Sequence, residues 1–116
     1  MTDAFEPVGP QPDVVQEHVA AILARDRHGR VLCQLRDDFL HVAAPGKWSL
    51  FGGLVEAGET LRAAAQREFF EETGLRVEQD QLRPMARIAS SVHIDWQINI
   101  FEVISEISPA DLRLGE

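Results

Sequence analysis

The segment 60–74 constrains the fold most, because its pattern is that of a capped α-helix. Thr60 is suited to the N-cap position and Gly74 to the left-handed position after a helix C-terminus. Three consecutive alanines between them favour helix. We therefore predict a helix over residues 60–72, with an apolar side that packs against a sheet. That side is formed by Leu61, Ala65 and Phe69.

The same helix carries a cluster of acidic residues. Glu68, Glu71 and Glu72 are spaced i, i+3 and i+4, so their carboxylates are expected on one side of the helix, opposite the apolar side and facing a cleft. Like charges at this spacing repel each other by a few tenths of a kcal/mol per pair. Clustered carboxylates without a nearby thiolate or imidazole suit a hard cation such as Mg²⁺, with Mn²⁺ as a substitute. The alternative is an acidic helix face that is merely solvated.

The chain around this helix resembles the Nudix family. The family's signature is matched by Gly53, Glu59, Arg67-Glu68, Phe69, Glu71-Glu72, Gly74 and Leu75. Every charged position and every glycine of the signature is present, and Phe69 stands where the family usually has an aliphatic residue. The resemblance implies an α/β (α+β) sandwich: a mixed β-sheet with the signature helix on one face.

The resemblance also implies roles for individual residues. Glu68 and Glu72 would be the primary metal ligands, Glu71 a further ligand or a holder of metal-bound water, and the backbone carbonyl of Gly52 another ligand. Arg67 would orient the glutamates, with Gly53 and Glu59 in supporting positions. Catalysis would rest on the glutamates and the arginine, with Glu68 as the leading general base for attack of water on a diphosphate phosphorus. These roles are expectations.

The rest of the chain predicts strands around the helix. Two apolar runs, His18–Ala24 and Val31–Leu35, flank turn-forming residues and indicate a β-hairpin. Further strands are predicted at Trp48–Val55, Leu82–Ala89 and Val92–Ile107. Residues 1–13 show no periodicity and are predicted to be an irregular leader, followed by a single Nudix domain over residues 14–116.

The C-terminal end departs from the family pattern. In the family a final helix follows the last strands, whereas this sequence ends at Glu116 without one. We expect a domain truncated at its C-terminus and lacking that helix, or else a sheet face covered by another subunit, as in a homodimer.

Residues outside the signature are candidates for binding substrate. Arg36 follows the second predicted strand, where a basic residue could reach a phosphate, although it could equally be a surface arginine. Aromatic rings that could stack on a base, or simply pack, are Phe39, His41 and Trp96. His93 alternates with apolar neighbours and could face the site or the solvent.

Composition narrows the class of ligand. The net charge of −8, from 19 acidic and 11 basic residues, disfavours a long nucleic acid. No stretch is long enough for a membrane helix, so we expect a cytoplasmic protein.

The predicted activity is Mg²⁺-dependent hydrolysis of a diphosphate linkage in a nucleoside diphosphate linked to another group, a small-molecule substrate. The alternative is a non-catalytic Nudix-like domain that senses such a ligand.

Overall fold

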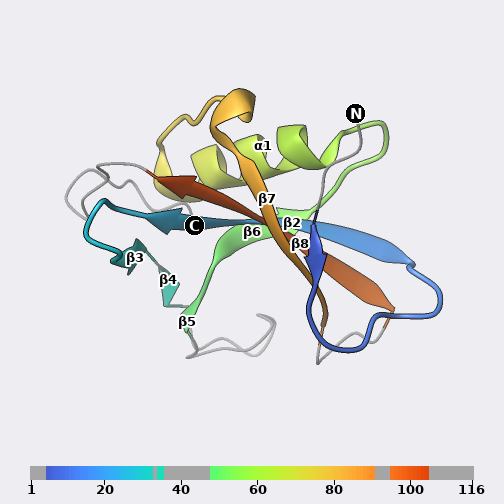
Figure 1. The fold of residues 1–116 in the computed structure, drawn as a ribbon. Coiled ribbons are helices and arrows are strands. Elements are labelled where there is room, and N and C mark those ends of the chain that lie inside the picture. The colour runs from blue at the N-terminus through green and yellow to red at the C-terminus, as the bar shows by residue number, and fades with distance from the viewer. Residues whose placement is uncertain (1–4, 33, 36–47, 91–94, 105–116) are drawn as a thin grey trace.

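The fold is given by a computed structural model that describes residues 5–32, 34–35, 48–90 and 95–104. Its elements are β1 (Glu6–Pro7), β2 (Glu17–Arg25), β3 (Val31–Leu32), β4 (Gln34–Leu35), β5 (Trp48–Ser49), β6 (Phe51–Leu54), α1 (Leu61–Thr73), the 3₁₀ turn η1 (Gln79–Gln81), β7 (Arg83–Ala89) and β8 (Trp96–Ile104). Figure 1 shows α1 lying across one face of the main sheet. The predicted mixed sheet with the signature helix on one face is confirmed. The expected absence of a last helix concerns residues 105–116, which lie outside the described part.

Strand β2 is the centre of the sheet. Along one edge it pairs in parallel with β8 over its whole length, and along the other it pairs antiparallel with β6 and then with β3. The β2–β3 pairing confirms the predicted hairpin. In β2, the residues Ala20, Ile22 and Ala24 are buried in the core. Because β2 contacts three strands, it determines where β6 lies relative to β8.

The N-terminal segment corrects one prediction. Residues 1–13 were expected to be irregular, but Glu6–Pro7 form β1, which pairs in parallel with β7 and extends the sheet. Phe5 is buried, with its ring centroid 5.0 Å from that of Phe101. A two-residue strand is too short to show the alternation that predicts a strand. It forms because the edge of β7 that does not face β8 offers backbone groups with which β1 can pair.

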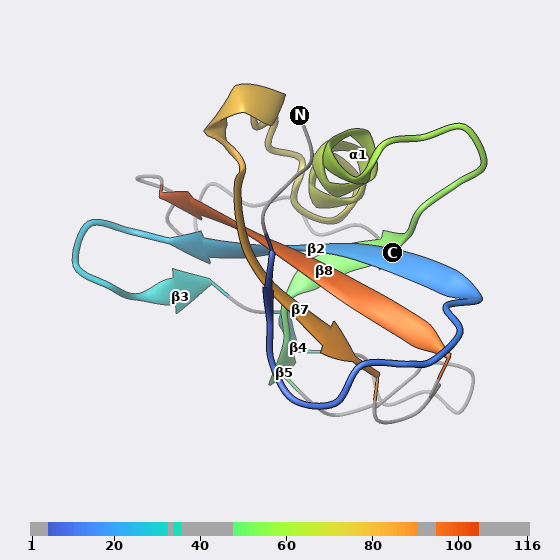
Figure 2. The ribbon, with the colours of Figure 1, turned by 45° about the vertical axis from the view of Figure 1, so that its right-hand side comes forward.

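Helix α1 has the caps that the sequence predicts. The side chain of Thr60 accepts a hydrogen bond from the backbone N–H of Ala63 at 3.1 Å, and Gly74 has a φ of 76° while its N–H donates to Phe70 at 2.8 Å. Figure 2 shows the helix above the sheet. Phe69 packs edge-on against Phe51 of β6, with 5.5 Å between ring centroids.

Two further differences concern the predicted elements. The predicted strand 48–55 is broken at Leu50 into β5 and β6, and η1 was not anticipated. Strand β8 is described only from Trp96 to Ile104, so its predicted ends lie outside the described residues. Within the described residues, no helix is long and apolar enough to cross a membrane.

Candidate active site

The site begins at two adjacent glycines of β6. Gly52 is paired with Ala21 of β2, and Gly53 with Ala20. A Cβ placed on Gly52 would collide with the backbone carbonyl oxygen of Ala20 and lie 2.7 Å from Cα of Ala21. A residue with a side chain at position 52 would therefore push β6 away from β2.

Gly53 leaves room for the carboxylate of Glu68. A Cβ on Gly53 would lie 2.5 Å from the carboxyl carbon of Glu68 and 2.6 Å from each of its oxygens. The Glu68 side chain is only 18% exposed. The carboxylate thus rests directly against the backbone of β6, in space that only a glycine leaves open.

Glu72 contacts the neighbouring glycine. Its Oε1 accepts a hydrogen bond of 2.7 Å from the backbone N–H of Gly52. Glu68 and Glu72 therefore converge on consecutive residues of one strand. This corrects the prediction that the acidic residues lie opposite the apolar side of the helix: these two point toward the sheet, as Phe69 does, Glu68 into the space over Gly53 and Glu72 to the backbone N–H of Gly52.

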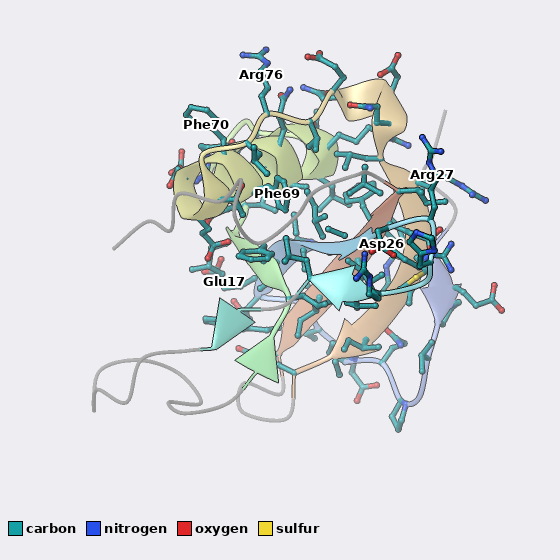
Figure 3. All side chains as sticks on the ribbon, turned by 90° about the vertical axis from the view of Figure 1, so that its left-hand side faces the viewer. Glu17, Asp26, Arg27, Phe69, Phe70 and Arg76 are labelled. Atoms are coloured by element: carbon teal, nitrogen blue, oxygen red, sulfur yellow. The ribbon has the colours of Figure 1, made fainter. Side chains whose placement is uncertain are left out.

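Glu71 belongs to a different surface of the helix. Its side chain is 53% exposed, and its Oε1 accepts a hydrogen bond from Arg67 at 2.9 Å. Figure 3 shows the corresponding contrast for the two adjacent phenylalanines, with Phe69 beneath the helix and Phe70 pointing away from the molecule. The three glutamates are thus divided by the structure, two toward β6 and one toward solvent.

Arg67 connects the acidic residues to the preceding loop. Its guanidinium binds both carboxylate oxygens of Glu59, at 2.8 and 3.0 Å, and donates to Glu68 at 2.8 Å. It also donates to the backbone carbonyl of Leu54 at 3.2 Å. One side chain therefore joins the helix, the loop that precedes it and the end of β6.

The charges of this network are mutually stabilised. The hydrogen bonds from Arg67, followed by the backbone N–H of Glu56, lower the pKa of Glu59 from 4.5 to about 2, although partial burial opposes the shift. The pKa of Arg67 is raised, mainly by its hydrogen bonds to Glu59 and then to Glu71. Both groups remain charged at neutral pH, so the ion pair between Arg67 and Glu59 does not titrate there.

The site residues fit a hard divalent cation. Their donors are carboxylate oxygens, and the space over Gly53 brings the Glu68 carboxylate against the strand to which Glu72 also points. Among the described residues, no three acidic, histidine or cysteine side chains form a ready-made cage. Mg²⁺ does not require one, since it usually binds through one or two carboxylates together with water and substrate phosphate.

Of the other predicted site residues, Trp96 alone belongs to the described part of the chain. Arg36, Phe39, His41 and His93 are outside the described part of the chain. Trp96 begins β8, is half-buried and pairs with Glu17 of β2. Alternation along β8 places it on the sheet face opposite Phe101, which lies in the core under α1. The structure therefore does not bring Trp96 to the same face as Glu68.

Two structural features were not anticipated from the sequence. The carbonyl of Leu54 carries no side-chain signal in a sequence. Asn99 is fully buried in β8, between Ile98 and Ile100. A polar residue at a core position is a signal that could have been used.

Comparison with known proteins identifies the family of this chain. Residues 15–104 match the family model described as the NUDIX domain. The chain belongs to the Nudix family. It is 34% identical over 71 residues to "Nucleoside triphosphatase NudI" from Enterobacter sp. (strain 638), a match that covers 61% of this chain and 49% of that protein. The chain thus spans about half the length of this curated relative.

Solved structures show the same fold. The MutT NUDIX hydrolase from Burkholderia pseudomallei has a TM-score of 0.71 at 21% identity, covering 92% of this chain and 76% of that one. A bifunctional NMN adenylyltransferase/ADP ribose pyrophosphatase from Francisella tularensis, complexed with AMP and a manganese ion, has a TM-score of 0.67 at 18% identity, over 94% of this chain and 33% of that one.

Proposed function

We propose that this Nudix protein hydrolyses, with Mg²⁺, a diphosphate linkage in a nucleoside diphosphate linked to another group. The observation that carries the proposal is the convergence of Glu68 and Glu72 on Gly52 and Gly53. Two carboxylates that converge on consecutive residues of one strand, one in the space over a glycine and one on a backbone N–H, are poorly explained as a solvated acidic face. Mn²⁺ is proposed as a substitute metal.

Each residue of the site has a proposed role. Glu68 and Glu72 hold the cation, with the carbonyl of Gly52 as a further ligand and Glu71 holding water at the outer side. When bound, the cation supplies positive charge to the phosphate oxygens and acidifies water. Glu68 is proposed to accept the proton of the attacking water. Arg67 keeps the glutamates oriented and Glu59 keeps Arg67 in place, as their hydrogen bonds suggest.

The substrate is proposed to be a small molecule. The similarity to a nucleoside triphosphatase and to a protein with ADP ribose pyrophosphatase activity supports nucleoside triphosphates and nucleotide sugars as the first candidates. Dinucleoside polyphosphates and dinucleotide cofactors follow. Candidate contacts to the base and phosphates remain Arg36, Phe39, His41 and His93.

The test is a hydrolysis panel over these substrates with and without Mg²⁺. We expect Glu72→Gln to lower the rate by roughly a thousandfold, since it removes a ligand worth several kcal/mol in the transition state. The matched control is Glu102→Gln, because Glu102 is paired with Arg25 at 3.3 Å and is distant in sequence from the signature. Equal rates in Glu72→Gln and the wild type would contradict the proposal.

The same panel separates catalysis from ligand sensing. Calorimetry would detect nucleotide binding directly, and chromatography would detect products. Binding without products at any Mg²⁺ or Mn²⁺ concentration would favour the non-catalytic domain.

We also propose a cytoplasmic location and a homodimer. The apolar residues Val19, Leu23 and Ile98 are only partly buried on the sheet face away from α1, as a second subunit on that face would require. Light scattering at micromolar concentration would give the mass, and a monomer mass of 13.0 kDa would contradict the dimer.

A further inference from the structure

Asn99 is a polar side chain in a position where the core is otherwise apolar. It is 0% exposed, and its neighbours on the same side of β8, Phe101 and Val103, belong to the core beneath α1. The other fully buried polar residue in the described part of the chain, Thr73, bonds to its own helix. Burial of an amide is costly unless its hydrogen bonds are made, so the bonds of Asn99 indicate what it holds.

Both ends of the Asn99 amide are used. Its Nδ2 donates to the backbone carbonyl of Val19 in β2 at 3.1 Å, and its Oδ1 accepts from Nε of Arg87 in β7 at 3.0 Å. Arg87 is held in turn by the N-terminal segment: its carbonyl accepts from the Gln11 side chain at 3.0 Å, and its guanidinium lies over the ring of Phe5. Asn99 therefore links the outer strands to the central strand.

A row of paired residues continues from Asn99 to the site. Arg87 is paired with Asn99, Asn99 with Ala20, and Ala20 with Gly53. Directly paired residues point to the same face of a sheet, so this row runs beneath α1 and ends at the glycine on which Glu68 rests. The carbonyl that Asn99 binds belongs to the peptide between Val19 and Ala20, the part of β2 that pairs with Leu54 and Gly53.

We propose that Asn99 is a positioning residue for the metal site: by holding the Val19–Ala20 peptide, it sets the place of Gly53 beneath Glu68. Asn99 contacts neither metal nor substrate in this scheme. Its catalytic consequence rests on the proposed function, but its structural consequence does not. A small displacement of β2 would move β6 with it, and with it Gly53, over which the Glu68 carboxylate lies.

Two variants separate the hydrogen bonds of Asn99 from its volume. Asn99→Leu has a similar volume and makes neither bond, whereas Asn99→Asp keeps the acceptor for Arg87 and loses the donor to Val19. The control is Val77→Ala, which truncates a buried core residue outside the site and destabilises the fold through a cavity. All three proteins are compared at a temperature where each is fully folded.

Three measurements test the proposal. The first is the Mn²⁺ dissociation constant by calorimetry, which we expect to rise roughly tenfold in both Asn99 variants, as outer-shell changes typically do. The second is kcat, expected to fall more than KM rises. The third is hydrogen exchange of the Gly52 amide in metal-free protein, because this N–H donates to Glu72 and should exchange faster when β6 shifts.

The outcomes are distinct. Faster Gly52 exchange in the Asn99 variants than in Val77→Ala, together with weaker Mn²⁺ binding, supports the positioning role. Gly52 exchange and Mn²⁺ binding that match those of Val77→Ala overturn it. A wild type that neither binds Mn²⁺ nor hydrolyses substrate refutes the proposed function instead, and the Gly52 exchange in metal-free protein then decides the role of Asn99 by itself.

Discussion

The tip of the β2–β3 hairpin and the candidate active site each contain a carboxylate that accepts a backbone hydrogen bond and pairs with an arginine. The two regions differ in how far along the chain the contacts of that arginine reach. At the tip, Asp26 accepts backbone hydrogen bonds from His28 and Arg30, both at 2.9 Å, and pairs with Arg30 at 2.6 Å. At the site, Glu59 accepts a backbone bond from Glu56 at 3.0 Å and pairs with Arg67. Both carboxyl groups have a lowered pKa.

The difference lies in what else each arginine holds. The contacts of Asp26 stay within a single turn, and the Arg30 side chain is 78% exposed. Arg67 is 26% exposed and also reaches Glu68 and the carbonyl of Leu54, 13 residues away in the chain. A turn of this kind forms locally, whereas the site exists only while α1 is packed on β6. The comparison can be tested with matched substitutions in the two regions.

The largest expected effect comes from glycine-to-alanine changes. Gly53→Ala would place Cβ within 2.6 Å of the Glu68 carboxylate oxygens, so we expect hydrolysis to fall by on the order of a hundredfold or more. Gly29→Ala meets no atom within 4 Å but has a φ of +81°, so it should cost about 1 kcal/mol of stability without loss of activity. Steady-state kinetics measure the hydrolysis rate of both variants, and thermal melts measure their stability. Full activity in Gly53→Ala would show that the position of the Glu68 carboxylate does not depend on the space over Gly53.

A smaller effect is expected from arginine-to-lysine changes. Arg67→Lys keeps the charge but cannot reproduce the bidentate bond to Glu59 together with the bonds to Glu68 and Glu71, so kcat should fall about 10- to 100-fold. Arg30→Lys alters an exposed pair and should leave kcat unchanged, with a melting temperature lower by no more than about 4 °C. Similar kinetic losses in the two variants would remove the distinction between the regions.

The smallest effect is on the pH dependence of stability. Because the folded-state pKa of Glu59 is about 2 and its ordinary value is 4.5, the unfolded chain binds the proton more readily between these values. The contribution of Glu59 is therefore present above about pH 4.5 and is lost as the pH falls toward 2. Melting temperatures from pH 2.5 to 7 should depend less steeply on pH in Glu59→Gln than in the wild type. An unchanged slope in that variant would show that the ion pair with Arg67 is not formed in solution.

Local features of the fold could be predicted from the sequence. The caps at Thr60 and Gly74, the helix between them and the β2–β3 hairpin all depend on residues a few positions apart, and all are present. The glutamate spacing predicts that Glu68, Glu71 and Glu72 lie on one side of the helix. It does not predict that Glu68 and Glu72 turn toward the sheet while Glu71 turns outward, because that depends on the space over Gly53 and on the backbone N–H of Gly52.

The sequence by itself determined the helix with its caps and the hairpin, because short-range hydrogen bonds and helical periodicity are encoded between near neighbours. Tertiary structure alone decided the pairing of β1 with β7, the seat of Glu68 on Gly53 and the bridge from Asn99 to Val19. Those contacts join residues up to 80 positions apart, and they form only once the strands have packed in register.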